Sequence, residues 1–353
     1  HTGYSRQNLV NKMNVLRKLT AFIIIISILP ALCGCSKEAV SPVKRSGFYF
    51  DTLVSITLYD GDAGLIDECF ELCDHYEKLF SKTIDSSDIS RINAASGGKT
   101  EVSADTISLI ETALKYHVLS DGAYDITIKP VIDLWGFEDL SGKTEHHLPD
   151  KDALSDALSH VSSDNILINK TDNTVTLTDP LSSIDMGSVA KGYIADRLKE
   201  FLLSRNVSSA VIDLGGNITL INGKPSGTGF TDFHIGIKDP TEPSGSETAL
   251  ALSVKDTSVV TSGIYERYLL IDGKKYHHII DKRTGYPTDN DLLSVTVITS
   301  SSADADALST VCLLCGEEKA LRIINSLSDT EAVFIKKDDT ISCSDGAEKY
   351  YLR

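Results

Sequence analysis

Short apolar runs joined by turn residues constrain the fold of this chain more than any other feature of its sequence. Each run is rich in Val, Ile or Leu, as expected of strands. The predicted strands are residues 210–214, 218–221, 233–237, 249–254, 259–261, 265–271 and 294–299. Strands that follow one another through short turns pair antiparallel. We therefore expect a mostly antiparallel sheet, with residues 294–299 as its last core strand.

Apolar residues at helical spacing lie mainly outside this strand series. The predicted helices are residues 65–80, 88–93, 103–119, 151–160, 188–203, 303–314 and 317–327. Alternating apolar positions predict one further strand at 48–58, and a hairpin is predicted at 165–178. Helices grouped apart from hairpin-linked strands indicate an α+β fold in which helices flank the sheet. No repeat or linker interrupts residues 46–353, so we expect them to form one unit.

Residues 1–35 have the composition of an export signal. A short basic segment at 13–18, where we place the start of translation, precedes an apolar run at 19–32 that is short for a membrane span. The run ends in Leu32-Cys33-Gly34-Cys35, which resembles a bacterial lipobox and predicts cleavage before Cys35 and lipid attachment to it. An ordinary signal peptide or a single anchor helix is the alternative. Residues 36–45 would then form a polar tether.

The acidic balance of the chain limits its partners. Its net charge is −16 at pH 7. Residues 1–35 hold four basic residues and no acids, so the rest of the chain carries about −20. Such a surface argues against nucleic acid and anionic lipid headgroups as partners. It would also repel a pyrophosphate ligand unless a metal ion or local basic side chains intervene.

The cysteines beyond the export signal do not have the spacing of a zinc site. Cys69 and Cys73 share one predicted helix, and Cys312 and Cys315 share another. Neither pair is accompanied by the second pair of ligands that zinc needs. We therefore expect buried helix cysteines, and whether either pair forms a disulfide stays open.

Two adjacent histidines lie near the end of a predicted hairpin. Residues 268–271 and Asp272-Gly273 are typical of a strand and a tight turn, so 276–280 is the expected return strand. Side chains alternate along a strand, and His277 and His278 should therefore face opposite ways. From these residues alone, a polar site at His278 and an exposed surface pair are equally good interpretations.

Two stretches place polar groups or glycines where a ligand could approach the backbone. Asp185 precedes a predicted helix with Lys191 in its first turn, which suits phosphate binding but also a plain helix cap. Gly215-Gly216 follows a strand, and its backbone could approach a ligand closely or simply make a tight bend.

Two further features have both a functional and a structural interpretation. Asp306 and Thr310 lie on one helix face and could give oxygen ligands to Mg²⁺, although a solvated acid explains Asp306 as well. Trp135 is the only tryptophan and follows a stretch of turn residues. It could form one wall of a pocket for a planar heterocycle, although core packing explains it equally well.

Taken in chain order, these stretches resemble the motifs of the ApbE family of FAD:protein FMN transferases. The matching segments are residues 80–81, 87–93, 122–127, 185–193, 213–217, 261–263 with 265–267, 278–281 with 284–285, and 306–308 with 310. Each is short, but together they follow the family's order over nearly all of the chain after the export signal. The resemblance implies a T-fold-related α+β catalytic unit at residues 46–353.

The resemblance also implies a reaction and the residues that carry it. Such enzymes use Mg²⁺ and move the FMN half of FAD onto a threonine or serine hydroxyl of a target protein, releasing AMP. His278 matches the family's catalytic residue, and the implied metal ligands are Asp306, Thr310 and the backbone carbonyl of Ser188. The residues implied to lie against FAD are Phe50, Ala123, Tyr124, Asp125, Asp185, Lys191, Gly215, Gly216 and Ile280.

Elementary chemistry agrees with this reaction. Attack on a pyrophosphate phosphorus needs charge neutralisation, positioning and an acceptor for the hydroxyl proton. A magnesium ion would supply the first, and His278, with an ordinary pKa of about 6.5, could accept the proton. Asp281 could orient His278 or lie in the turn that follows. Lys282 stands where the family usually has proline, so the backbone of that turn is expected to differ.

Partners and a location are implied as well. Targets are expected among subunits of Rnf-type or sodium-pumping NADH:quinone reductases and among extracellular FMN-binding domains, with a Ser/Thr-Gly-Ala-Ser/Thr acceptor motif. The lipid on Cys35 would anchor the chain to the extracytoplasmic face of the cell membrane. Two alternatives remain: a pyrophosphatase that splits FAD into FMN and AMP with water, and a non-enzymatic flavin-binding lipoprotein.

Overall fold

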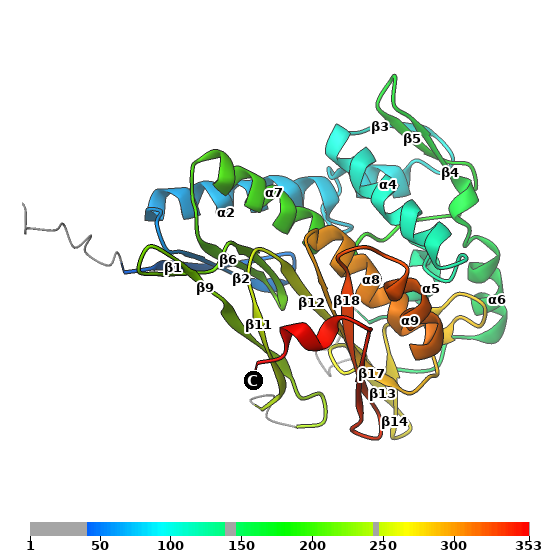
Figure 1. The fold of residues 1–353 in the computed structure, drawn as a ribbon. Helices are drawn as coiled ribbons and strands as arrows, with labels where there is room; N and C mark the ends of the chain where they lie inside the picture. Colours follow the sequence, from blue (N-terminus) through cyan, green and yellow to red (C-terminus); the bar gives the residue numbers. More distant parts are fainter. Residues whose placement is uncertain (1–40, 138–145, 243–246, 353) are drawn as a thin grey trace, which may run out of the picture. The chain divides into compact units, whose positions relative to one another are not determined.

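An eight-stranded antiparallel sheet runs through the computed structural model (Figure 1). The structure describes residues 41–137, 146–242 and 247–352, and the sheet order within them is β1-β2-β6-β7-β12-β17-β18-β19. The strands are β1 Val43–Tyr49, β2 Thr52–Leu58, β6 Ala210–Leu214, β7 Asn217–Ile221, β12 Ser258–Gly263, β17 Leu292–Thr299, β18 Glu331–Lys336 and β19 Ile341–Cys343. Each neighbouring pair is antiparallel, so the predicted α+β class is confirmed.

Helices pack against the sheet to form the main core. Val295 of β17 and Phe334 of β18 point into this core together with the apolar faces of the helices. The helices that contribute to it are α2 Ala63–Phe80, α3 Asp88–Ala94, α4 Ala104–Leu119, α7 Ala190–Ser204, α8 Ser302–Cys315 and α9 Glu317–Asn325. Cys69, Cys73 and Cys312 lie buried in α2 and α8, as expected of structural helix cysteines.

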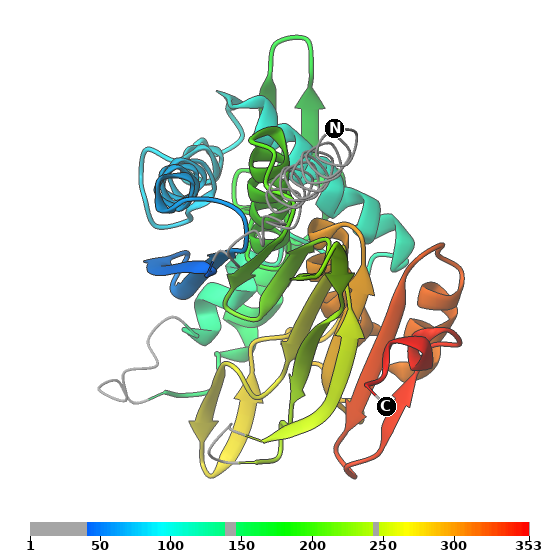
Figure 2. The ribbon, with the colours of Figure 1, turned by 60° about the vertical axis from the view of Figure 1, so that its left-hand side comes forward.

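A second core forms where the intervening strand positions point the other way. Val259 of β12, Ile298 of β17 and Val333 of β18 pack against Phe233 and Leu252. These last two belong to the antiparallel pair β10 Phe233–Lys238 and β11 Thr248–Val254, which lies beside the sheet together with the short helix η3 Ala347–Tyr350 (Figure 2). Strands β12, β17 and β18 are therefore buried on both faces, because successive side chains of a strand point to opposite sides.

A third core holds the histidine hairpin. Trp135 is buried there, donates a hydrogen bond from Nε1 to the Gly285 carbonyl at 2.8 Å, and packs its ring against Tyr276 and Tyr286. The surrounding elements are α5 Lys129–Trp135, α6 Lys151–Ser159, β13 Tyr268–Ile271, β14 Lys274–His277, β15 Ile280–Asp281 and β16 Tyr286–Pro287. Of the two interpretations of Trp135, core packing is therefore the correct one.

Smaller elements complete the described part of the chain. They are the three-stranded sheet of β3 Lys99–Glu101, β5 Thr174–Leu177 and β4 Ile166–Asn169, the turn η2 Ser163–Asn165, and the hairpin β8 Lys224–Ser226 with β9 Gly229–Thr231. Residues Pro42–Arg353 form one compact unit. No helix in the described ranges is both long and apolar enough to cross a bilayer. The predicted signal and Cys35 lie outside those ranges.

Several predicted boundaries are wrong for physical reasons. The strand expected at 48–58 is two strands, because Phe50 and Asp51 adopt φ values of 54° and 57° and reverse the chain without a glycine. Residues 294–299 are not the last core strand, since β18 pairs with β17 on its outer side. The strand expected at 265–271 begins only at Tyr268, and the helix at 129–135 was not predicted.

Helices α7 and α8 approach each other so closely that a glycine is required between them. A Cβ at Gly192 would overlap with the backbone carbonyl of Ser302 at the start of α8. Asp196, one turn later on α7, accepts hydrogen bonds from the N–H groups of Ser302 at 2.8 Å and Ala303 at 3.0 Å. One helix therefore caps the other, which satisfies N–H groups that have no partner within α8.

We predict that Gly192→Ala destabilises the protein by about 1–3 kcal/mol, because the methyl group must push α7 away from backbone atoms of α8. Gly229→Ala is the matched control, since a Cβ there meets open space. The free energy of unfolding, measured by denaturant titration, checks this. Equal stability of the two variants would contradict the close contact.

Candidate active site

Two loops from distant parts of the chain pair with each other and bring a phenol next to a serine. The Asn93 side chain accepts the N–H of Ile184 at 2.7 Å and donates to the carbonyl of the same residue at 2.9 Å. The next N–H of that loop donates to the Ile126 carbonyl at 2.8 Å. As a result, Tyr124 Oη lies 2.7 Å from Ser188 Oγ.

Asp306 is a buried carboxylate that holds α7 and α8 together. Its side chain is 3% exposed, and its Oδ2 accepts the backbone N–H of Gly192 at 2.9 Å. Its Oδ1 lies 3.3 Å from Lys191 Nζ, which also donates to the Gly187 carbonyl at 3.2 Å. A positive charge therefore already lies between the carboxylate and a backbone carbonyl one residue before Ser188.

Hydroxyl groups follow Asp306 along α8. Thr310 lies one helical turn later on the same face and is half-buried. Ser309 donates to the Asp306 carbonyl at 2.8 Å, and its Oγ lies 2.7 Å from Ser262 Oγ on β12. The structure thus brings the predicted metal-ligand side chains, Asp306 and Thr310, onto one helix face with further oxygen atoms beside them.

Tyr124 remains a neutral phenol in this environment. Burial raises the pKa of its hydroxyl most strongly, and the nearby charges of Asp306 and Asp185 raise it further. The hydrogen bond with Ser188 acts in the opposite direction but does not cancel these effects. Tyr124 can therefore offer a hydroxyl hydrogen bond beside Ser188 without adding a negative charge.

The two histidines have different partners. The return strand expected at 276–280 is wrong in its bounds, because β14 ends at His277 and His278 lies in the bend that follows it. His277 is buried; its Nε2–H donates to the Thr288 carbonyl at 3.1 Å, and its Nδ1 accepts the N–H of Ile279 at 3.3 Å. His278 is less buried, and its Nδ1–H donates to the Arg267 carbonyl at 3.1 Å. That bond fixes the tautomer of His278 and leaves the lone pair on Nε2 to accept a proton.

Positive charges act on the imidazole of His278. Burial lowers the pKa of its imidazole to about 4, and the positive charges of Arg267 and Lys191 lower it as well. Glu266 responds to the same groups: burial raises the pKa of its carboxyl, Lys191 lowers it, and Asp306 raises it. The charge of Lys191 thus acts on the pKa of both His278 and Glu266, and the imidazole of His278 is neutral at pH 7.

Lys282, which departs from the family pattern, forms an ion pair with Asp125. Its Nζ lies 2.8 Å from Asp125 Oδ2, while Thr127 Oγ1 and Ser163 Oγ donate to Asp125 Oδ1 at 2.6 and 2.8 Å. Burial acts to raise the pKa of Asp125, but the bonds from Lys282 and Thr127 keep it below its ordinary value. The pair ties the turn after His278 to the Tyr124 loop; contact of Asp125 with FAD stays a prediction.

Asp281 lies in a turn rather than orienting His278. Its carboxylate accepts the N–H of Arg283 at 2.9 Å and pairs with the guanidinium of that residue at 2.7 Å, and its carbonyl accepts the N–H of Gly285 at 2.8 Å. Of the two roles considered for Asp281, the structure supports the turn. The neighbouring Ile280 is buried with Trp135 in the third core, so its contact with a flavin stays a prediction.

The remaining predicted binding residues lie in two places. Asp185 accepts the N–H of Gly187 at 2.7 Å and pairs with Lys82 Nζ at 2.7 Å, which holds it beside the Ser188 loop. Ala123 directly precedes Tyr124 and is half-buried. Phe50, Gly215 and Gly216 form a second group where the β1–β2 and β6–β7 turns meet, because the Gly215 N–H donates to the Leu53 carbonyl at 3.2 Å.

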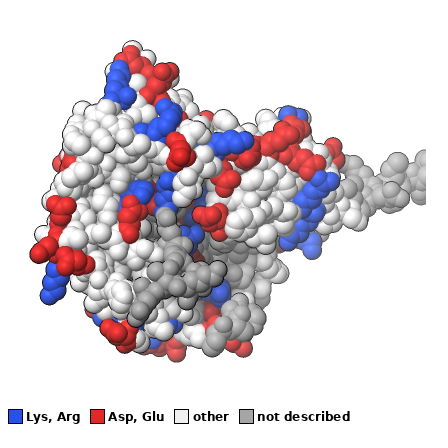
Figure 3. All heavy atoms as spheres, turned by 180° about the vertical axis from the view of Figure 1, so that it is seen from behind, with Lys and Arg blue, Asp and Glu red and all other residues white. Residues whose placement is uncertain are grey.

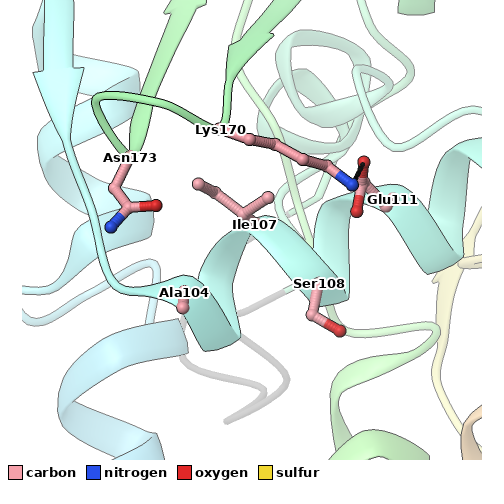
Figure 4. Close-up of a pocket in the computed structure, with 6 residues that line it drawn as sticks. All are labelled: Ala104, Ile107, Ser108, Glu111, Lys170 and Asn173. Carbon is pink, nitrogen blue, oxygen red and sulfur yellow. Dashed lines mark ion pairs between the residues drawn. The ribbon is translucent and has the colours of Figure 1, made fainter.

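A groove of about 220 Å³ lies elsewhere, between α4 and the turn of the β4–β5 hairpin (Figure 4). Figure 4 shows the ion pair of Lys170 and Glu111 at one end of it, at 2.8 Å. The lining residues are Ala104, Ile107, Ser108, Glu111, Lys170 and Asn173. None of them belongs to the predicted site.

Comparison with known proteins decides the family. Residues 50–334 match the model of the ApbE family. The chain belongs to the ApbE family. The matched span includes His278, Asp306, Thr310 and both paired loops, so the resemblance noted in the short motifs is confirmed over most of the described structure.

Named ApbE relatives are similar over nearly their whole length. A protein of Klebsiella pneumoniae named FAD:protein FMN transferase is 34% identical over 292 residues, covering 82% of this chain and 88% of the relative. One of the same name from Treponema pallidum is 32% identical over 340 residues, covering 92% of each. Among solved structures, the ApbE protein of Thermotoga maritima superposes with a TM-score of 0.80 at 27% identity, covering 89% of this chain and 100% of that one. The flavin transferase ApbE of Vibrio cholerae gives 0.77 at 26% identity, covering 88% and 99%.

Sequence reasoning missed the ion pairs that assemble this ApbE site. Lys282 and Asp125 are 157 positions apart, and Lys82 and Asp185 are 103 apart, so no local pattern links them. The one available signal was Lys282 itself, because it replaces an expected proline.

The buried His277 should make stability depend on pH. Burial lowers the pKa of its imidazole to about 4, whereas the unfolded chain has about 6.5. The stability from the neutral imidazole is therefore fully present above pH 6.5 and is lost as pH falls through 4. Between pH 7 and pH 4 the free energy of unfolding falls in the parent and in His277→Gln. We predict that this fall is smaller in His277→Gln, by up to about 3 kcal/mol.

Unfolding titrations across this pH range provide the measurement. His234→Gln, an exposed histidine on β10, is the control and should keep the full pH dependence. If His277→Gln and the parent lose stability equally, the buried imidazole is not the cause.

Proposed function

We propose that this chain transfers the FMN half of FAD to a threonine or serine hydroxyl of a target protein and releases AMP. The observation that carries the proposal is the neutral His278, with its Nε2 lone pair available, in an ApbE-family fold that also holds the buried Asp306 against Lys191. The similarity to two proteins named FAD:protein FMN transferase supports the same reaction.

His278 acts as the proton acceptor. The attacking hydroxyl oxygen forms a bond to the FMN phosphorus while the bond from that phosphorus to the bridging oxygen of AMP breaks. The hydroxyl proton passes to Nε2 of His278, because Nδ1 already carries the hydrogen donated to the Arg267 carbonyl. A pKa of about 4 keeps the imidazole unprotonated at neutral pH, and AMP leaves with the bridging oxygen.

The oxygen atoms around Asp306 fit a magnesium ion. In the described part of the chain no group of three His, Cys, Asp or Glu side chains is placed to hold a metal, so an ion at Asp306 would also need hydroxyl and carbonyl oxygens as ligands. Asp306, Thr310 and the Ser188 carbonyl are the residues we assign, and the ammonium of Lys191 against Asp306 supports a place for a cation there. When bound, Mg²⁺ would neutralise charge on the pyrophosphate.

The remaining residues bind and orient FAD. Lys191 brings positive charge to the start of α7, where backbone N–H groups also favour phosphate. Tyr124 offers its hydroxyl, and the Asp185–Lys82 pair keeps the Ser188 loop in place. Charged side chains of both signs are interspersed over the face shown in Figure 3, so local cations rather than a basic surface must attract the ligand.

The location and target belong to the same proposal. We assign the chain to the extracytoplasmic face of the cell membrane, held by a lipid on Cys35, which lies outside the described residues. Target proteins would be membrane redox subunits of the Rnf or sodium-pumping type, or extracellular FMN-binding domains. Each would present a Ser/Thr-Gly-Ala-Ser/Thr segment whose hydroxyl reaches His278.

One assay tests the reaction against its alternatives. The chain from Ser36 onward is incubated with FAD, Mg²⁺ and a target domain, and the target mass and released AMP are measured. A mass gain equal to FMN together with AMP supports transfer. AMP without labelling would indicate an FAD pyrophosphatase. If neither labelled target nor AMP is detected, the flavin-binding protein is the remaining alternative.

We predict that His278→Ala lowers the labelling rate by at least about 100-fold while FAD still binds, because only proton acceptance is lost. The labelling rate is followed by target mass, and FAD binding by flavin fluorescence. His234→Ala, an exposed histidine on β10, is the matched control and should label normally. Labelling by His278→Ala at the parent rate would remove this residue from the mechanism.

Asp306→Asn should lose both labelling and the dependence of activity on Mg²⁺, because the amide has no charge to offer a cation. Asp304→Asn is the control on the same helix, since Asp304 pairs with Lys115 at 3.1 Å instead. A titration of labelling against Mg²⁺ measures both variants. A magnesium response of Asp306→Asn that matches the parent's would place the metal elsewhere.

A further inference from the structure

Lys191 occupies the place where a metal would meet Asp306. Its ammonium lies 3.3 Å from Asp306 Oδ1 and 3.2 Å from the Gly187 carbonyl. The second oxygen of Asp306 is already committed to the Gly192 N–H at 2.9 Å. Oδ1 is therefore the carboxylate oxygen left to hold a cation, and Lys191 holds it here.

The burial of Asp306 explains why its carboxylate needs a positively charged partner. Its side chain is 3% exposed, and a buried carboxylate without a positive partner is strongly destabilising. The Lys191 side chain is 29% exposed, so its ammonium has a path to solvent. A flexible four-carbon stem lets this group move while its backbone stays in α7.

We propose that Lys191 is a displaceable counter-ion for the metal site. In the metal-free protein its ammonium neutralises Asp306 and keeps the carboxylate in place. A divalent cation competes for Oδ1 and displaces the ammonium, which then turns toward the anionic pyrophosphate of the substrate. This inference rests on the proposed function, because it takes Asp306 as a metal ligand.

Competition has a direction that can be measured. A metal ion that must displace the Lys191 ammonium binds more weakly than it would to a free carboxylate. Its apparent affinity is reduced by the fraction of the protein in which Asp306 Oδ1 is free. If Lys191 holds Oδ1 about nine-tenths of the time, its removal strengthens divalent-cation binding about tenfold. The metal-free protein should at the same time lose stability, since Asp306 is left without its cation, whereas the metal-bound protein should not.

Binding of Mn²⁺ and Mg²⁺ to the chain from Ser36, without FAD, tests this directly. Calorimetry or the electron spin resonance of Mn²⁺ gives the affinity, and thermal unfolding with and without metal gives the stabilisation. Lys191→Met should bind the ion about tenfold more tightly and show a larger metal-induced rise in Tm than the parent. Lys191→Gln, which keeps a polar end without charge, serves if the Met variant does not fold.

Lys199→Met is the matched control on the same helix, because Lys199 pairs with the exposed Asp256 at 3.1 Å. It should bind the ion like the parent. Unchanged or weaker binding by both Lys191 variants would overturn the proposal, as would parent-like binding by Asp306→Asn. Tighter binding by Lys191→Met with no FMN transfer by the parent would instead overturn only the proposed reaction.

Discussion

The contact between Asp306 and the backbone of Gly192 is the interaction on which the rest of the site depends. It requires α7 and α8 to lie so close that no side chain fits at Gly192, and Asp196 secures the same approach by capping α8. Because the carboxylate is buried at this junction, its second oxygen needs a cation. Helix packing and the charge of the site are thus set by one contact.

The histidine is held by different means. The hairpin that ends at His278 packs on Trp135 in its own apolar core, and the turn after it is joined to the Tyr124 loop by the ion pair of Lys282 with Asp125. His278 and Asp306 are therefore positioned by separate supports. For the proposed reaction this matters, since a misplacement of about 1 Å between reacting groups is costly.

Lysine–aspartate pairs recur around the site of a chain that is strongly acidic overall. Asp306 pairs with Lys191, Asp125 with Lys282, and Asp185 with Lys82. Each carboxylate is largely buried and each lysine is more exposed than its partner. The net charge of the chain therefore says little about the local field at these pairs.

The sequence by itself determined the fold class, the main helices, and the placement of Asp306 and Thr310 on one helix face. These follow from local periodicity. Only the tertiary structure decided that 48–58 turns at Phe50, that β18 extends the sheet, that Trp135 is core, and that Lys282 binds Asp125. Such features depend on contacts between residues far apart along the chain. The free energy gained by burying apolar surface favours one set of these contacts only when the whole chain is folded.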